Sequence, residues 1–444
     1  MIIMNKRLLK SIRDKIPESL KYITAPIFRN KLLKDQVFCK YTNLLENREL
    51  LSFEKINEYQ FDQLKLILKY SFQNVPYYTD LFNKINFKPE EFKSFDDFKV
   101  IPFLTKEIIR ENFDKLISTK DVKGGCYSTT TSGSTGEPLK LLLDYKSFFK
   151  ENAFIYYFRK KLGYHYNDRL VTFRGIDFGG KLWRYNPMHN EIIFSPLKLT
   201  KRTLELYRKK INEIKPAYLN GYFSSIYYFA KLLSENNQTL NFRLKGIFLS
   251  SENIDEDERL FVESFFQVKS LTFYGHTERC VIAQELRHNE YLFDPYYGFT
   301  EQVGINDNTF EIVGTGFLNK TMPLIRYKTD DLCKISSNGS VSVVGRRDIK
   351  DFLIGTNDEK IFSSSLHSLS DILNNVAKHQ FIQNEKGKAI LLIVPDKGFK
   401  YSEVALIKSA LDKEVKDVID FEIKVEDRVV LTSGGKSQMF IRTI

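Results

Sequence analysis

Helical and extended patterns alternate through the centre of the chain, and this alternation constrains the fold more than any other feature. Helical patterns cover residues 201–214, 222–235 and about 255–266. Short apolar runs bounded by polar residues lie beside them, at 246–249 and 268–273. Such runs are typical of strands that are buried on both faces of a sheet. Helices and buried strands in alternation predict an α/β domain.

The pattern restarts after Gly345. Residues 309–344 are rich in extended patterns and poor in helix. Beyond Gly345 come a strand pattern at 388–394, a helical pattern at 402–415 that Ser402 is placed to cap, and a strand pattern at 421–425. A stretch of about 100 residues is long enough for a small domain of its own.

We therefore predict two domains in this chain of 444 residues. A large N-terminal α/β domain covers residues 1–344 and is mainly helical over residues 1–120. A small α+β domain, which the resemblance described below implies is a lid, covers residues 345–444. The hinge between them is predicted near residues 345–351.

Proline and threonine set helix boundaries in the N-terminal part. Residues 47–75 form a helical pattern that ends before Pro76, because proline restricts the residue before it and lacks an N–H donor. Thr105 is then in position to cap a helix that continues to Leu116.

Charge and composition exclude several classes of protein. The net charge is +11, but acidic residues interleave with the basic ones, which indicates a solvated surface and no nucleic-acid partner. The four cysteines form no CxxC pair, which argues against a zinc knuckle or a disulfide framework and suits a reducing cytosol. No apolar run is long enough to span a membrane, so we expect a cytoplasmic protein. The basic and apolar stretch 6–21 is either an ordinary surface helix or a site of peripheral association with an anionic membrane.

A loop rich in glycine and hydroxyl groups is the strongest motif. It runs Thr129-Thr130-Thr131-Ser132-Gly133-Ser134-Thr135-Gly136-Glu137-Pro138 between two extended stretches. Glycines let main-chain N–H groups approach a ligand, and hydroxyls add donors, so the loop could enclose a polyphosphate. It is not a Walker loop, because the Gly-Lys-Ser/Thr ending is missing. A flexible linker is the alternative interpretation.

Four further segments carry groups suited to a nucleotide. The first of them is Phe273-Tyr274-Gly275-His276-Thr277-Glu278, which lies at the end of a predicted strand, at the edge where open α/β sheets bind ligands. Glu278 could hold Mg²⁺, and Tyr274 could stack on a base. Arg326-Tyr327-Lys328-Thr329-Asp330-Asp331 offers a carboxylate for ribose hydroxyls. Gly345-Arg346-Arg347-Asp348 lies at the predicted domain boundary. Ser433-Gly434-Gly435-Lys436 places a lysine, a compact mobile cation, on a glycine loop.

The five segments in this order resemble the adenylate-forming superfamily of acyl-CoA synthetases and related ligases. Within it they are similar to the phenylacetate–coenzyme A ligase-like branch that includes capsular polysaccharide biosynthesis proteins. The resemblance covers most of the chain, from Asn74-Val75-Pro76-Tyr77-Tyr78 onwards. It implies ATP and Mg²⁺ as cofactors, and a mobile lid that turns between two half-reactions.

The resemblance also implies a role for individual residues. Catalytic roles fall on Lys436, which would bridge the carboxylate and the α-phosphate, and on Glu278, which would bind Mg²⁺. The hinge carboxylate falls on Asp348 or Asp351, and the ribose carboxylate falls on Asp331, with Asp330 in place of the residue that usually precedes it. Nucleotide contacts are expected from Thr131, Ser132, Gly133, Ser134, Thr135, Gly136, Ser251, Glu252, Tyr274, Gly275, His276, Thr277, Asp331 and Arg346.

The implied function is ATP-dependent activation of a carboxylic acid as an acyl-adenylate, with release of pyrophosphate. We expect transfer to an amine acceptor in surface polysaccharide biosynthesis, because the glycine that the family has near Asp358-Glu359 is missing. Coenzyme A, which would give a thioester, is the alternative acceptor, and a non-catalytic nucleotide-binding scaffold is a further alternative. Contacts to a polar, anionic substrate are expected from Arg174, Lys181, Arg184 and Tyr222.

Overall fold

The structure is a computed structural model of the chain. It describes residues 17–48, 52–120, 125–131, 139–175, 180–250, 254–306, 308–344, 352–362, 366, 372–373, 375–396, 398–427, 429–430 and 439–444.

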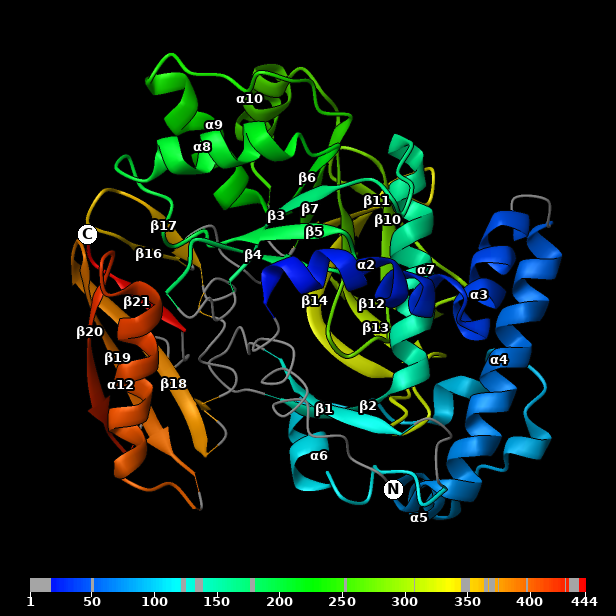
Figure 1. Ribbon diagram of the computed structural model, residues 1–444. Coiled ribbons are helices and arrows are strands. Elements are labelled where there is room, and N and C mark those ends of the chain that lie inside the picture. The colour runs from blue at the N-terminus through cyan, green and yellow to red at the C-terminus, as the bar shows by residue number, and fades with distance from the viewer. Residues whose placement is uncertain are drawn as a thin grey trace.

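A six-stranded sheet with helices packed against it forms the predicted α/β core (Figure 1). Its order is β4-β5-β3-β6-β7-β8, and every neighbouring pair is parallel except β4 with β5. The strands are β3 Leu170–Phe173, β4 Trp183–Asn186, β5 Glu191–Phe194, β6 Tyr218–Tyr222, β7 Gly246–Ser250 and β8 Ser270–Leu271. The apolar faces of three helices share one buried cluster with this sheet, namely α8 Leu204–Ile214, α9 Phe223–Glu235 and α10 Glu256–Phe266.

The predictions for this region are confirmed except at one strand. The three helices and β7 lie where the patterns placed them, and the Asp255 side chain caps α10 by accepting from the Glu258 N–H at 3.0 Å. The predicted strand at 268–273 is wrong as a single strand, because Thr272 separates β8 from β9, Phe273–Gly275. β9 pairs with a different sheet, so the chain changes sheets at the point where the Tyr274 motif begins.

The second sheet is antiparallel and has the order β12-β13-β14-β15-β11-β10-β9. It contains the region that was predicted to be rich in strands. Its strands, besides β9, are β10 Ile282–Arg287, β11 Glu290–Phe293, β12 Gly298–Asn306, β13 Thr309–Gly316, β14 Tyr327–Ile335 and β15 Val341–Val344.

The N-terminal part is mainly helical, as predicted, but two of its boundaries differ. The helix predicted at 47–75 begins at Phe53, capped by Ser52, and ends at Asn74 before Pro76. Thr105 caps α6 as predicted, but α6 ends at Glu111 and not at Leu116, because Asn112 leaves the helical conformation. The helices here are α2 Glu18–Leu33, α3 Gln36–Asn47, α4 Phe53–Asn74, α5 Pro76–Lys84, α6 Lys106–Glu111 and α7 Tyr145–Arg159, with short 3₁₀ turns η2 Pro89–Glu91, η3 Asp97–Val100 and η4 Lys160–Leu162.

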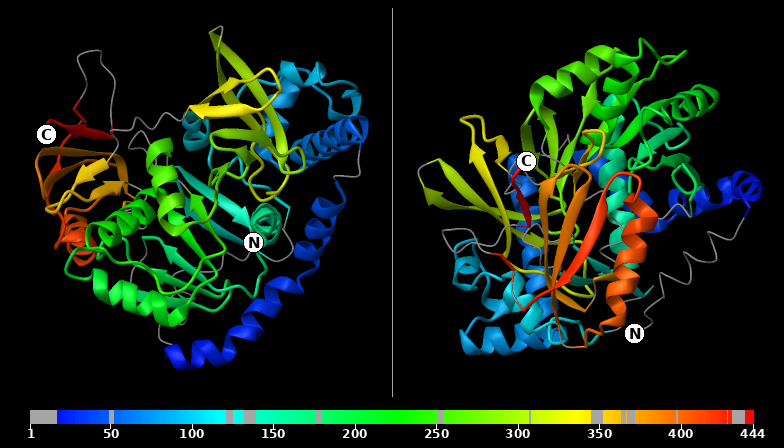
Figure 2. Two further views of the ribbon diagram at one scale, coloured as in Figure 1. Left: turned by 90° about the horizontal axis from the view of Figure 1, so that it is seen from above. Right: turned by 90° about the vertical axis from the view of Figure 1, so that its left-hand side faces the viewer.

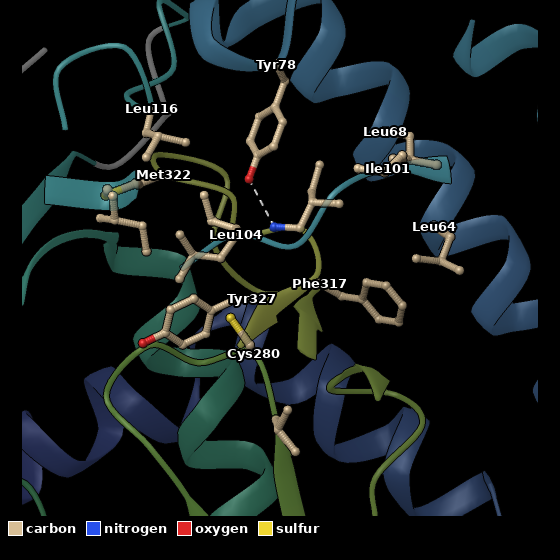
Figure 3. Close-up of a cluster of buried hydrophobic side chains, with 14 of the residues drawn as sticks. Leu64, Leu68, Tyr78, Ile101, Leu104, Leu116, Cys280, Phe317, Met322 and Tyr327 are labelled. Carbon is tan, nitrogen blue, oxygen red and sulfur yellow. Dashed lines mark hydrogen bonds between the residues drawn. The ribbon is translucent and has the colours of Figure 1, made fainter. Parts of the chain in front are cut away.

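A buried cluster joins these helices to the second sheet (Figure 3). Tyr78 belongs to it, and its hydroxyl accepts from the Ile325 N–H at 3.0 Å and donates to the Pro323 carbonyl at 3.1 Å. Leu64 and Leu68 of α4 belong to the same cluster. Tyr327 of the second sheet and Cys280, in the turn before β10, also belong to it. Because Tyr327 also contacts the Glu278 motif, this cluster fixes the base of the candidate site.

The chain after residue 351 forms sheets of its own, seen at the left of Figure 1 and of the left view of Figure 2, and facing the viewer in the right view of Figure 2. β16 Phe352–Ile354 pairs with β17 Lys360–Phe362, and a second sheet has the order β20-β19-β18-β21. Its elements are β18 Val376–Glu385, β19 Lys388–Pro395, α12 Ser402–Val415, β20 Asp420–Val425 and β21 Phe440–Arg442. Their apolar side chains share one buried cluster, to which the earlier chain contributes Leu197.

Three of the elements in this part match the predictions. β19, α12 and β20 lie at the predicted positions, but Tyr401 and not Ser402 occupies the cap position of α12, and Ser402 begins the helix. An ion pair joins this part to α10, with Lys360 Nζ at 3.5 Å from Glu258 Oε1.

The cysteines are all described. Cys126, Cys280 and Cys333 are buried and Cys39 is exposed, and all four are free thiols. Of the helices in the described ranges, none combines the length and the apolar character needed to cross a membrane. Of the stretch 6–21, where a surface helix or a membrane contact was considered, residues 6–16 lie outside the described residues, and α2 begins at Glu18.

Candidate active site

A cavity of about 220 Å³ lies at the edge of the six-stranded sheet where β3, β6 and β7 end. The carboxyl ends of parallel strands meet at one edge, which is where open α/β sheets bind ligands. The cavity wall is partly apolar, with phenylalanines from α7, β3, β7 and β9. Its polar side chains are Arg159, Thr172, Arg174, Asn220, Tyr222, Ser250 and Thr272.

Gly221 permits the close approach of β3 and β6 beneath the cavity. Its φ is +133°, and a Cβ at this position would lie 2.1 Å from the Phe173 carbonyl oxygen. A side chain would therefore force the two strands apart, and only glycine fits without strain.

The predicted nucleotide motif continues directly from the cavity wall. Phe273 lines the cavity, and Tyr274, the next residue, donates its hydroxyl to Asp331 Oδ2 at 2.8 Å. Burial raises the pKa of Tyr274 well above its usual range, so the hydroxyl stays protonated and remains a donor. The structure thus brings together two predicted nucleotide-binding residues that lie far apart in the sequence.

Glu278 is buried in the turn after β9. The Tyr327 hydroxyl donates to its Oε1 at 2.8 Å. His276 Nδ1 lies 3.2 Å from its Oε2, although neither ring nitrogen is aligned for a hydrogen bond. Burial opposes ionisation of this carboxyl, but the adjacent His276 and the hydrogen bond from Tyr327 outweigh it and lower the pKa to about 2. Glu278 is therefore a carboxylate at neutral pH.

Arg279 anchors this turn to α7. Its guanidinium lies 2.6 Å from Glu151 Oε2 and donates to the Ser147 hydroxyl at 2.6 Å. Within the same motif His276 is partly buried, and Gly275 and Thr277 are exposed.

A bulge in β14 separates the two aspartates that compete for the ribose role. The pairing with β13 shifts between Lys328 and Leu332, and Asp330 has a φ of +66°. Bulges commonly re-aim side chains beside active sites. Asp331 turns toward Tyr274, whereas Asp330 lies 3.0 Å from Lys106 Nζ on α6. The geometry therefore favours Asp331, the predicted residue.

The two strands that flank the phosphate-loop motif form a hairpin. β1 Cys126–Thr130 pairs with β2 Lys140–Asp144. The Thr131 N–H donates to the Leu139 carbonyl at 3.0 Å, and the Leu139 N–H donates to the Thr131 hydroxyl at 3.1 Å. Thr131 thus closes the base of the loop, as the position of the motif between two extended stretches predicts.

Several predicted site residues lie outside the described residues. They are Ser132, Gly133, Ser134, Thr135 and Gly136 of the loop, Ser251 and Glu252 after β7, Arg346, the hinge candidates Asp348 and Asp351, and Lys436. Their roles stay predictions.

The predicted substrate residues fall into two groups. Arg174 and Tyr222 line the cavity. Lys181 is exposed and Arg184 lies on the edge strand β4, and neither belongs to the cavity wall.

Sequence reasoning missed Arg159 and Asn220, which line the cavity and are joined by a hydrogen bond of 2.8 Å. Arg159 follows an aromatic helical stretch and precedes two lysines, so nothing in its local sequence distinguishes it from a surface cation.

A metal at this site would rely on few protein ligands. The described residues contain no group of three or more side chains suited to hold a metal ion. An ionised Glu278 nevertheless fits Mg²⁺, which commonly binds through one or two carboxylates, with substrate phosphates and water completing its shell.

Comparison with known proteins gives consistent matches. Residues 353–443 match the family model of the CapK C-terminal domain. Protein CapK of Staphylococcus aureus is 25% identical to this chain over 94% of this chain and 97% of that protein. Phenylacetate-coenzyme A ligase of Aromatoleum evansii is 22% identical over 70% of this chain and 75% of that protein.

Solved structures match the fold. The crystal structure of 2-hydroxyisobutyryl-CoA ligase in complex with 2-HIB-AMP and CoA matches with a TM-score of 0.58 and 15% identity, covering 89% of this chain and 92% of that chain. The same ligase in its postadenylation state matches with a TM-score of 0.56. The predicted fold class, a large α/β part followed by a small α+β part, and the predicted resemblance are confirmed.

Proposed function

Because this chain resembles CapK along almost its whole length and has the fold of an acyl-CoA ligase, we propose that it is an AMP-forming carboxylate ligase. It activates a carboxylic acid with ATP and then passes the acyl group to an amine during surface polysaccharide synthesis. The observation that carries this proposal is the junction at β9. There the cavity wall continues directly into Tyr274 and Glu278, and Tyr274 contacts Asp331.

In the first half-reaction, a carboxylate oxygen of the acid attacks the α-phosphorus of ATP. The bond from that phosphorus to the bridging oxygen breaks, and pyrophosphate leaves with the electron pair. The acid occupies the cavity and Asp331 accepts from the ribose hydroxyls. Holding both reactants in line supplies much of the rate enhancement, because their freedom of motion is already lost on binding.

Two positive charges would stabilise the negative charge that develops on the phosphates. Glu278 would hold Mg²⁺, which when bound would neutralise the phosphates as pyrophosphate departs. Lys436 would bridge the carboxylate and the α-phosphate from the C-terminal part, which we propose as a lid domain over residues 345–444. A cation placed where negative charge grows lowers the barrier by electrostatic stabilisation.

The proposed amine acceptor follows from the expected role in surface polysaccharide synthesis, whereas the polar cavity bears on the acid. A missing glycine near Asp358-Glu359 first argued against coenzyme A, but Gly355 lies in the same turn. A Cβ at Gly355 would lie 2.3 Å from Glu359 Oε2, the end of a side chain that could move aside. Coenzyme A therefore stays the alternative acceptor. Arg159, Arg174 and Asn220 in the cavity still favour a polar acid of the kind used in glycan synthesis over a plain aryl acid.

The test is exchange of labelled pyrophosphate into ATP with a panel of acids that includes uronic and amino acids. We expect exchange that depends on both the acid and Mg²⁺. A non-catalytic scaffold would bind ATP but show no exchange with any acid. The acid that supports exchange is then offered to coenzyme A and to amino sugars or amino acids in competition. Rapid thioester formation without amide product would replace the amine by coenzyme A and leave the first half-reaction in place.

A further inference from the structure

One wall of the cavity carries a continuous row of hydrogen bonds. The Arg159 guanidinium donates to Asn220 Oδ1 at 2.8 Å, and Asn220 Nδ2 donates to the Thr172 hydroxyl at 3.1 Å. The Thr172 hydroxyl donates to Glu191 Oε2 at 2.7 Å. Arg174 completes the row, with its guanidinium 3.4 Å from Glu191 Oε1. Each member is oriented by the next, so the row holds Arg159 in a fixed position.

The charges along this row do not cancel. Burial opposes ionisation of Glu191, but Arg174, His189 and the hydrogen bonds from Thr172 and Asn186 lower its pKa to about 2, so it is a carboxylate. Burial lowers the pKa of His189 to about 4, so this ring is neutral at neutral pH. Glu191 therefore balances Arg174, and Arg159 remains as one positive charge in excess.

Arg159 has no carboxylate partner within 4.0 Å among the residues that the structure describes. Its Nε is buried and makes no hydrogen bond. Its other neighbours are the rings of Phe248 and Tyr164, whose centroids lie 4.8 Å and 5.6 Å from the guanidinium carbon. A guanidinium carries five N–H donors, so donors beyond the one bound to Asn220 remain for a ligand in the cavity that Arg159 lines.

We infer that Arg159 recognises a second anionic group on the acid that the enzyme activates. The substrate class is then a small diacid, with one carboxylate free for activation and the other anionic group bound by Arg159. The inference rests on the proposed function and names the substrate class of the same site. The size of the cavity agrees, because an apolar cavity of about 150 Å³ holds benzene and this one is about 220 Å³.

The experiment compares acids of equal size that differ only in charge at the far end. Succinate, glutarate, adipate and isophthalate are each tested for pyrophosphate exchange against their own monoamides. The amide keeps the shape and replaces the far carboxylate by a neutral group. We expect at least one diacid to exceed its monoamide in kcat/KM by about tenfold or more, because charge-assisted hydrogen bonds to guanidinium are the stronger kind.

Variants then assign that preference to Arg159. Arg159→Gln should bring the ratio of diacid to monoamide close to one, because only the diacid uses the contact to the guanidinium charge. Arg159→Lys should keep part of the ratio, which guards against a Gln variant that fails to fold. Lys160→Gln removes a neighbouring charge that pairs with Glu46 on the surface, and it should keep the full ratio.

The outcomes separate this inference from the proposed function. Exchange with monocarboxylates or monoamides but no preference for any diacid would overturn the inference and support adenylation. A diacid preference that survives in Arg159→Gln would also overturn it. Absence of exchange with every acid would overturn the proposed function, and the inference with it.

Discussion

Glu278 carries its negative charge in a place where burial alone would keep it neutral. His276 and the hydroxyl of Tyr327 compensate for the lost hydration, and the pKa of Glu278 falls to about 2. A pKa below the usual value means that this carboxylate stabilises the fold above about pH 4.5, and that the contribution is lost as the pH falls toward 2. At neutral pH its charge is therefore available for a metal ion.

Glu278→Gln tests that use of the charge. Glutamine keeps the shape and still accepts from Tyr327, but it is a weak ligand for Mg²⁺. We expect the Mg²⁺ concentration for half-maximal pyrophosphate exchange to rise by at least about tenfold, or exchange to disappear. Tyr327→Phe is the matched control, because it removes the hydrogen bond and keeps the carboxylate. A Glu278→Gln enzyme with an unchanged Mg²⁺ dependence would contradict the role.

Single residues show where sequence reasoning reached its limit. The motif order placed Asp331 and Tyr274 in one site, and the structure joins them by a hydrogen bond. The choice between Asp330 and Asp331 needed the bulge in β14, which depends on the register against β13 and leaves no local pattern. Arg159 was missed because its position in the cavity depends on how α7 packs against the ends of β6 and β7.

At the scale of elements, β3 and β6 approach each other closely beneath the cavity, where Gly221 lies against the Phe173 carbonyl. We predict that Gly221→Ala destabilises the protein by about 3 kcal/mol or more, because the new Cβ would overlap the Phe173 carbonyl and the strands would have to separate. Urea unfolding at equilibrium measures this change.

Gly180→Ala provides the control for backbone conformation. Gly180 also has a positive φ, +85°, but an added Cβ would meet no atom of the described residues within 4 Å. Its cost should be limited to the strain of the left-handed conformation, about 1 kcal/mol. Equal destabilisation by the two substitutions would show that the close approach contributes nothing.

Periodicity predicted whole elements better than their ends. Long helices with a clear apolar face, such as α9 and α10, were found at the right positions, because their faces meet one buried cluster. β18 was missed, since its residues 376–385 mix polar and apolar side chains. The 47–75 helix was predicted too long at its start because the pattern extends back to α3, which ends at Asn47.

For the whole molecule, the described strands divide at residue 344. Neither of the two large sheets contains a strand from the later chain, and the later sheets contain none from the earlier chain. Leu197 and the pair of Lys360 with Glu258 are contacts between the two parts. The described strands are therefore consistent with a separate C-terminal domain, and its role as a lid stays a proposal.

A chain truncated after residue 344 tests the two-domain proposal. We expect it to unfold cooperatively and to bind ATP, because the six-stranded sheet, the second sheet and Glu278 are all retained. It should lose pyrophosphate exchange by several orders of magnitude, because Lys436 is absent. Lys436→Ala in the full chain should reproduce that loss, whereas Lys416→Ala, an exposed lysine of the same part, should not. A truncated chain that cannot fold would contradict the division.

Cys39 is an exposed thiol to which a fluorescent dye can be attached. Three of its four thiols are shielded by the core, so a maleimide dye should react with Cys39 in the otherwise native chain. One added cysteine at the exposed Lys400 would then place a second dye on the C-terminal part. Energy transfer between the two dyes would follow the approach of that part during each half-reaction, one molecule at a time, without removal of any native thiol.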